Sequence, residues 1–157
     1  MALSTSTYGQ KYAHVNLGNL LTQMPEMEAS SKELQTYQEQ LTNDLQQKVQ
    51  KWEKKVTDLQ GMVNNLTPIQ VKEKEAELLK EQEQILKEEQ ELTTKFLEKR
   101  NTIMAPIIAK AQDAIKLVGR EKGFTMIFDT SVPNLILFAE DMEDVSGLVL
   151  EKLGIKK

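Results

Sequence analysis

The sequence predicts a mostly helical α+β protein, with a long antiparallel helical hairpin and a small β body to which both ends of the chain contribute. Apolar residues recur every three or four positions through two long segments in the middle of the chain, which is the spacing of a helix stripe. One break, between Asn64 and Pro68, separates these segments. Short apolar segments that suit strands lie outside the hairpin, near both ends.

The composition favours long helices over an ordinary compact globule. Charged residues make up 28% of the 157 residues and aromatic residues only 5%, a usage typical of coiled coils. Such a chain buries little core of its own, so we expect it to assemble with further copies. The net charge of -4 gives no reason to expect nucleic-acid binding. The absence of cysteine excludes disulfides and thiol chemistry, and no run approaches the roughly 18 apolar residues of a membrane span.

The first 30 residues are predicted to hold a tail, a strand and a short helix. Residues 1–10 are rich in Ser and Thr and predict a disordered tail. A strand over residues 11–16 is followed by a helix over residues 17–24 that stops at Pro25, because the residue before a proline avoids helical angles. The tail lacks the charged and apolar regions of an export signal. The chain is therefore either cytosolic or a mature form whose signal was replaced by a start Met.

Two arm helices follow. The first is predicted over residues 31–66, with Ser30 or Ser31 as its N-cap, and its narrow apolar stripe indicates a seam with one partner helix. The stripe consists of Leu34, Tyr37, Leu41, Leu45, Val49, Trp52, Val56, Leu59, Val63 and Leu66. After a turn, Pro68 suits the first position of the second helix. That helix carries apolar doublets seven residues apart, beginning with Leu78 and Leu79, and should kink at Pro106.

The C-terminal part is predicted to return to the β body. Residues 119–123 end the second arm helix with two glycines. Residues 124–128 form a strand, and residues 135–139 form another that pairs with it as a hairpin. A final helix begins near Asp141 or Asp144 and ends at Gly154. We expect residues 11–30 and 105–157 to form the body and oligomerisation region, and residues 31–104 to form the arm.

Three strands of about five residues make a poor independent sheet with open edges. Oligomerisation that joins sheets from several chains would remove those edges. The apolar residues of the body are therefore predicted to form its core or an interface between chains. The predicted oligomerisation residues are Val15, Leu17, Phe124, Met126, Phe128, Leu135, Leu137 and Phe138.

In their order, these pieces resemble the Skp/OmpH family of periplasmic chaperones. The resemblance rests on YAHVNLGNLL, the Gln/Glu/Lys-rich hairpin, PIIAKAQDAIKLVGREKGFTMIFD and VPNLILFAEDMEDVSGLVLEKL, and it covers residues 11–154. It implies a homotrimer in which strands from three chains build a small β barrel. It also implies that three hairpins enclose unfolded outer-membrane proteins in a cavity without ATP, and that the mature protein is periplasmic.

The end of the hairpin carries more apolar surface than a solvated turn needs. We predict that it contacts the client, with a hydrophobic clasp that closes the turn as the alternative. These residues are Leu59, Met62, Val63, Leu66, Ile69 and Val71. Members of the family that this chain resembles are often basic, whereas residues 73–91 hold eight Glu against three Lys. That acidic segment puts a membrane or lipopolysaccharide contact in doubt.

No catalytic constellation is found in the sequence. It has no Gly-rich phosphate loop, no GxSxG and no zinc spacing, and no His or Cys completes an acid–base or metal site in the acidic segment. We therefore expect no enzyme, no metal and no cofactor. Two other functions stay open: a prefoldin-like cytosolic holdase and a structural or tethering coiled-coil protein. Prefoldins place their strands in the middle of the hairpin, whereas here the strands lie outside it.

Overall fold

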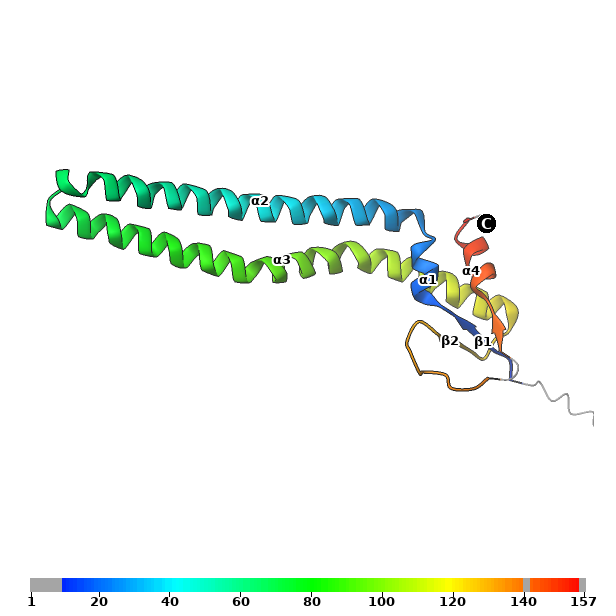
Figure 1. Ribbon diagram of the computed structural model, residues 1–157. Helices are drawn as coiled ribbons and strands as arrows, with labels where there is room; N and C mark the ends of the chain where they lie inside the picture. The colour runs from blue at the N-terminus through cyan, green and yellow to red at the C-terminus, as the bar shows by residue number, and fades with distance from the viewer. Residues whose placement is uncertain (1–9, 140–141, 156–157) are drawn as a thin grey trace, which may run out of the picture. The chain divides into compact units, whose positions relative to one another are not determined.

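A computed structural model describes residues 10–139 and 142–155 of the protein (Figure 1). The chain divides into two compact units, which we call the hairpin unit, Ser31–Thr102, and the body unit, Met1–Ser30 with Ile103–Lys157. Long helices dominate the described chain, and one small sheet accompanies them. The predicted fold class, mostly helical α+β, is confirmed.

The hairpin unit is built from two antiparallel helices, α2 (Pro25–Met62) and α3 (Pro68–Lys122), both of which continue into the body unit (Figure 1). A 3-10 turn, η1 (Val63–Asn65), follows α2. Thr67 and Gln70 then form a capping box: Thr67 N–H donates to Gln70 Oε1 at 2.9 Å, and Gln70 N–H donates to Thr67 Oγ1 at 3.3 Å. The predicted turn before Pro68 is confirmed.

The predicted start of the first arm helix was wrong. Ser30 and Ser31 do not cap α2, because the helix already begins at Pro25. A proline lacks the backbone N–H, but at the first helical position that N–H would have no partner, and the fixed φ of proline suits a helix. Pro25 therefore prevents α1 from continuing and is also the first residue of α2. The preceding helix, α1 (Leu17–Thr22), stops before Pro25 as predicted. At its other end α2 stops at Met62, four residues before the predicted Leu66.

The second arm helix ends near the predicted position. α3 continues through Pro106 and Gly119 and stops at Lys122, where Gly123 follows with a φ of +69°. Glycine adopts this left-handed conformation without steric cost, so it ends the helix cleanly. The kink at Pro106 stays a prediction.

The body sheet has three strands in the order β2-β1-β3, and both pairings are parallel. They are β1 (Tyr12–Val15), β2 (Met126–Asp129) and β3 (Glu143–Asp144). The predicted strand over residues 135–139 and its hairpin were wrong, because these residues lie outside the strands. Instead β1 is the strand that pairs with β2. A parallel pair requires a long connection between its strands, and α2 and α3 supply it.

The core of the body unit lies between the sheet, α1, α3 and α4 (Ser146–Lys152). Alternate residues of β1, Ala13 and Val15, are buried, which is the period of a strand with one covered face. The rest of this core comes from the helices and from residues beside them: Leu20, Met24, Ile107, Ala111, Ala114, Val118, Val145, Val149 and Leu150. By contrast, none of residues 31–102 is buried.

Short polar contacts fix the ends of the body elements. Asn19 N–H donates to Asn16 Oδ1 at 2.8 Å and caps α1. Ser146 N–H donates to Asp144 Oδ1 at 2.9 Å where α4 begins, and Gly154 follows the helix with a φ of +75°. Asp144 and Gly154 are thus at the two ends of the last helix, as predicted. Asp141 and the predicted tail, except Gln10, lie outside the described residues.

Candidate functional site

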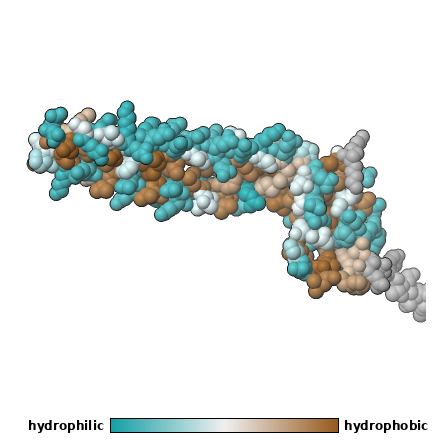
Figure 2. All heavy atoms as spheres, viewed as in Figure 1, coloured by the Kyte–Doolittle hydropathy of each residue, from teal (hydrophilic) through white to brown (hydrophobic). Residues whose placement is uncertain are grey.

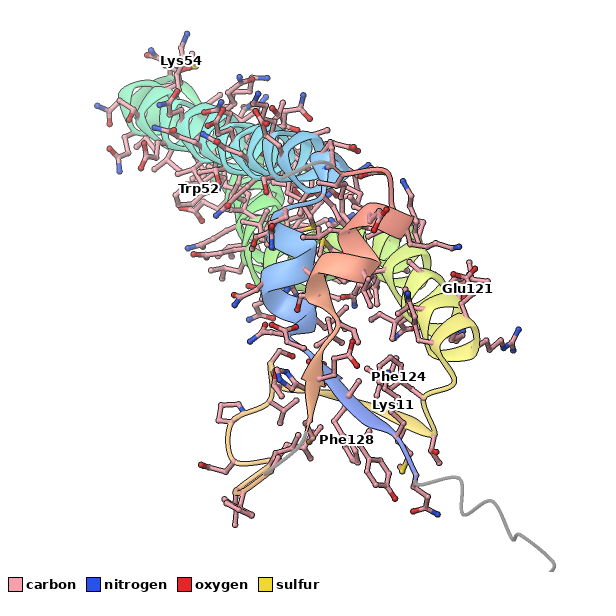
Figure 3. All side chains as sticks on the ribbon, turned by 90° about the vertical axis from the view of Figure 1, so that its right-hand side faces the viewer. Lys11, Trp52, Lys54, Glu121, Phe124 and Phe128 are labelled. Atoms are coloured by element: carbon pink, nitrogen blue, oxygen red, sulfur yellow. The ribbon has the colours of Figure 1, made fainter. Side chains whose placement is uncertain are left out.

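The seam of the hairpin is the line along which its two helices pack. Its predicted stripe is half-buried except for Val63, which is exposed. Figure 2 shows hydrophobic side chains gathered between α2 and α3, with hydrophilic side chains on the outer faces. Trp52, labelled in Figure 3, donates from its indole N–H to the backbone oxygen of Leu78 at 2.9 Å. The seam therefore combines apolar packing with a polar contact between the helices.

The apolar residues predicted at the end of the hairpin surround its turn and fall into two groups. Leu59, Leu66 and Val71 are half-buried, as expected of a clasp that closes the turn. The other three are exposed, with Ile69 at 72% of its surface: Met62, Val63 and Ile69. This second group leaves apolar surface in contact with solvent.

One flank of the hairpin is charged, and ion pairs cross it. Lys48 pairs with Glu88, and Lys55 pairs with Glu81. The hydrogen bond from Lys48 lowers the pKa of the Glu88 carboxyl. Two shallow grooves of about 310 and 200 Å³ lie on this flank. Their lining includes the charged residues Lys48, Lys51, Lys55, Asp58, Lys74, Glu77, Glu81 and Glu88.

The other flank has a groove of about 350 Å³ with a different lining. Glu75 is its one charged member, and the others are Trp52, Val56, Leu59, Gln60, Val63, Leu78, Leu79 and Gln82. Leu79 is 60% exposed, and Leu86, seven residues further along α3, is also exposed. Each of these leucines is the second member of a doublet whose first member, Leu78 or Ile85, lies half-buried. The doublets are visible in the sequence, but their spacing alone gives no role to the second members.

The predicted oligomerisation residues are distributed unevenly in the body unit. Val15 is buried in the core of this chain, and Leu17 packs against that core. Phe124 and Phe128 are half-buried. Lys11 Nζ lies 4.2 Å from the centre of the Phe124 ring, and Figure 3 shows these two side chains near each other. The rings of Tyr12 and Phe128 are 6.3 Å apart. The other four are exposed: Met126, Leu135, Leu137 and Phe138.

The exposed apolar surface of the body is concentrated in one segment. Leu137 and Phe138 are 88% and 82% exposed. Val132, which was not among the predicted oligomerisation residues, is exposed near them in the chain. Val132 lies between the two predicted strands and was therefore predicted to be part of a turn. A residue in a turn is not expected to contact another chain. We call Met126, Val132, Leu135, Leu137 and Phe138 the body patch.

In the part of the chain that the structure describes, no cluster of three His, Cys, Asp or Glu residues could hold a metal ion. Within the same residues, no helix has the length and apolar character to cross a membrane. The surfaces that stand out are therefore the end of the hairpin, its weakly charged flank and the body patch.

A family model and two individual proteins match this chain over most of its length. The model of the family described as "Outer membrane protein (OmpH-like)" matches residues 11–153. The chaperone protein Skp of Yersinia enterocolitica is 28% identical to this chain over 165 residues, which cover 98% of this chain and 92% of that protein. The chaperone protein Skp of Photorhabdus luminescens is 26% identical over 150 residues, which cover 91% of this chain and 85% of that protein.

Proposed function

This chain belongs to the OmpH-like family, and on that premise we propose that it is an ATP-independent holdase chaperone for unfolded outer-membrane β-barrel proteins. Chaperones named Skp align with nearly the whole chain. The observation that carries the proposal is the exposed apolar surface of the hairpin, where Ile69 and Leu79 are 72% and 60% exposed. A rigid tether has no need of such side chains.

The proposed mechanism is passive. An unfolded β-barrel protein exposes alternating apolar residues and unpaired strand edges, which aggregate. Apolar contacts with single exposed side chains are individually weak, because burial stabilises in proportion to the area covered. Many such contacts hold the client while each one exchanges rapidly. The client then stays unfolded, soluble and releasable without ATP.

We also propose that the protein assembles as a homotrimer through the body unit. The body patch supports this, because its five apolar residues are more than half exposed, and exposed apolar residues near one another in the chain are typical of surfaces that contact other proteins. The small sheet supports it as well, since three short strands with open edges gain from neighbours. In the proposed trimer, strands from three chains form a barrel. The hairpins then enclose the client in a cavity.

The mature protein is proposed to act in the periplasm, which unfolded outer-membrane proteins must cross. The proposed client contacts are the residues at the end of the hairpin, from Leu59 to Val71. The proposal includes no membrane or lipopolysaccharide contact, since the eight Glu of residues 73–91 outnumber the three Lys there and would repel an anionic surface.

Light scattering on a sizing column tests this function. The protein is run alone and after a urea-unfolded outer-membrane porin is diluted into it. We expect a mass near three times the 17.9 kDa of one chain, and an increase by one porin in the mixture. A trimer that leaves the porin to aggregate would contradict the holdase and favour a tethering role. A monomer or dimer that still holds the porin would contradict the trimer alone.

A further inference from the structure

We propose that a client segment binds along one flank of the hairpin, the flank with the groove lined by Trp52, Gln60, Leu79 and Gln82. This inference rests on the proposed function and deepens it, because it says which side of the two helices faces the client. The occupant is an extended, uncharged apolar segment of an unfolded β-barrel protein. We call this side the client flank and the side with the ion pairs the charged flank.

The grooves on the two flanks differ in charge. Only Glu75 is charged among the residues that line the client-flank groove. On the charged flank, Lys48 and Lys55 are already paired with Glu88 and Glu81. An apolar segment placed there would cover these groups, and removing charges from water is costly. The same segment meets little charge in the client-flank groove.

Exposed leucines continue from the client-flank groove along α3. Leu79, Leu86 and Leu97 are all exposed. Eighteen residues complete five helical turns, so Leu97 lies in line with Leu79, and Leu86 is close to the same line. These leucines span about 27 Å of helix, which is room for an extended segment of about eight residues. A membrane β-strand has about 9–11 residues, so the lengths are comparable.

Most polar side chains in the client-flank groove are uncharged amides. Gln60 and Gln82 line it together with the apolar side chains. A glutamine amide both donates and accepts hydrogen bonds without carrying charge. An extended client segment has unpaired backbone N–H and C=O groups, which need such partners when they leave water. Leucines that can cover apolar side chains and amides that can pair with the backbone together suit an extended apolar segment.

Two glutamines two residues apart on α3 give a matched test. Gln82 lines the client-flank groove and Gln84 lines a groove on the charged flank, and both are exposed. The chain has no cysteine, so Gln82→Cys and Gln84→Cys each provide one site for a benzophenone maleimide. Each labelled protein is mixed with the unfolded porin and irradiated. We expect cross-links from position 82 at least several-fold stronger than from position 84.

A second measurement gives the affinity. Leu79→Ser combined with Leu86→Ser should raise the Kd for the fluorescently labelled unfolded porin about tenfold, because two exposed apolar side chains are lost. Leu117→Ser, an exposed leucine of α3 in the body unit, is the control and should leave the Kd unchanged. Circular dichroism checks the helices of each variant. If the double variant loses helicity, the comparison of cross-links from positions 82 and 84 tests the client flank in its place.

The outcomes separate the inference from the function on which it rests. Equal cross-linking from positions 82 and 84, or stronger cross-linking from 84, would overturn the client flank while the chaperone function stands. An unchanged Kd in a fully helical double variant would do the same. If the unaltered protein fails to keep the porin soluble, the proposed function is wrong and the client flank falls with it.

Discussion

The indole N–H of Trp52 donates a hydrogen bond of 2.9 Å to the backbone oxygen of Leu78. The bond joins α2 to α3 within the hairpin unit, where no residue between 31 and 102 is buried. Because the seam is only half-buried, apolar packing fixes the alignment of the two helices weakly. A directional bond from a side chain to a helix carbonyl fixes which turn of α3 lies beside Trp52.

Replacement of this tryptophan by phenylalanine tests its role. Trp52→Phe keeps an aromatic ring in the seam but removes the N–H donor. We expect the free energy of unfolding to fall by about 1 kcal/mol, measured by urea denaturation with circular dichroism. Lys54→Ala, at an exposed position of α2, is the control and should change it by less than about 0.5 kcal/mol. An unaltered urea midpoint in Trp52→Phe would show that packing alone sets the alignment.

Asp129 links the two ends of the chain in the body unit. Its Oδ1 accepts a hydrogen bond from Leu17 N–H at 3.1 Å and from Ser131 N–H at 2.8 Å. Burial by itself raises the pKa of the Asp129 carboxyl. The hydrogen bonds from the Ser131 backbone and hydroxyl and from Leu17 outweigh burial, so this pKa is held below its ordinary value of 3.8. The ionised carboxylate is therefore the form that the fold stabilises.

This depressed pKa predicts a dependence of stability on acidity. A group whose pKa is lower in the folded chain contributes stability above its unfolded pKa, and the contribution is lost as pH falls through the folded pKa. Asp129→Ala should lower the free energy of unfolding at pH 7 by about 1–2 kcal/mol. Asp129→Asn keeps an acceptor but cannot ionise, so it should lose less stability than the unaltered protein below pH 4. Parallel pH–stability curves for the two proteins would refute this role.

The end of the hairpin is predicted to take part in client contact. Met62→Ser combined with Ile69→Ser removes two exposed apolar side chains and should weaken the holding of unfolded porin several-fold, because apolar area is lost. Turbidity of diluted porin and circular dichroism of the variant are the measurements. Undiminished holding with intact helicity would leave these residues only a role in closing the turn.

The body patch predicts how the assembly can be broken. Leu137 and Phe138 are the most exposed apolar residues of that patch, so a combined Leu137→Ser and Phe138→Ser variant should fold as a chain but assemble poorly. Light scattering should show a lower mass at micromolar concentration than for the unaltered protein. The control is Leu117→Ser, an exposed leucine outside the patch. A double variant that keeps the full mass would place the interface elsewhere.

The hairpin was predictable because its signals are local. A 3.6-residue period, the cap at Thr67 and the proline at Pro68 all act within one or two helical turns. The body sheet was predictable only in part. The strand near residue 126 was found, but its partner was misassigned to residues 135–139, because adjacent apolar segments suggest a hairpin. The true partner, β1, lies more than 100 residues away in the chain.

The candidate site shows the same division. The apolar residues at the end of the hairpin and in the body were selected from hydropathy, since exposed apolar residues break a hydrophilic pattern. The difference between the two flanks was not found from the sequence. This difference depends on which residues of α2 lie beside which residues of α3. Lys55 and Glu81, for example, form an ion pair on one flank, and their positions in the sequence do not reveal this pairing.

The sequence by itself determined the long helices, their turn, the strand-forming segments at both ends and the resemblance to a family of chaperones. Each of these follows from residue spacing along one stretch of chain or from the order of such stretches. Only the tertiary structure decided that β1 pairs in parallel with β2 and that Val15 is buried while Leu137 is exposed. It also decided which flank of the hairpin carries charge. These features depend on contacts between residues distant in the chain, which local periodicity does not specify.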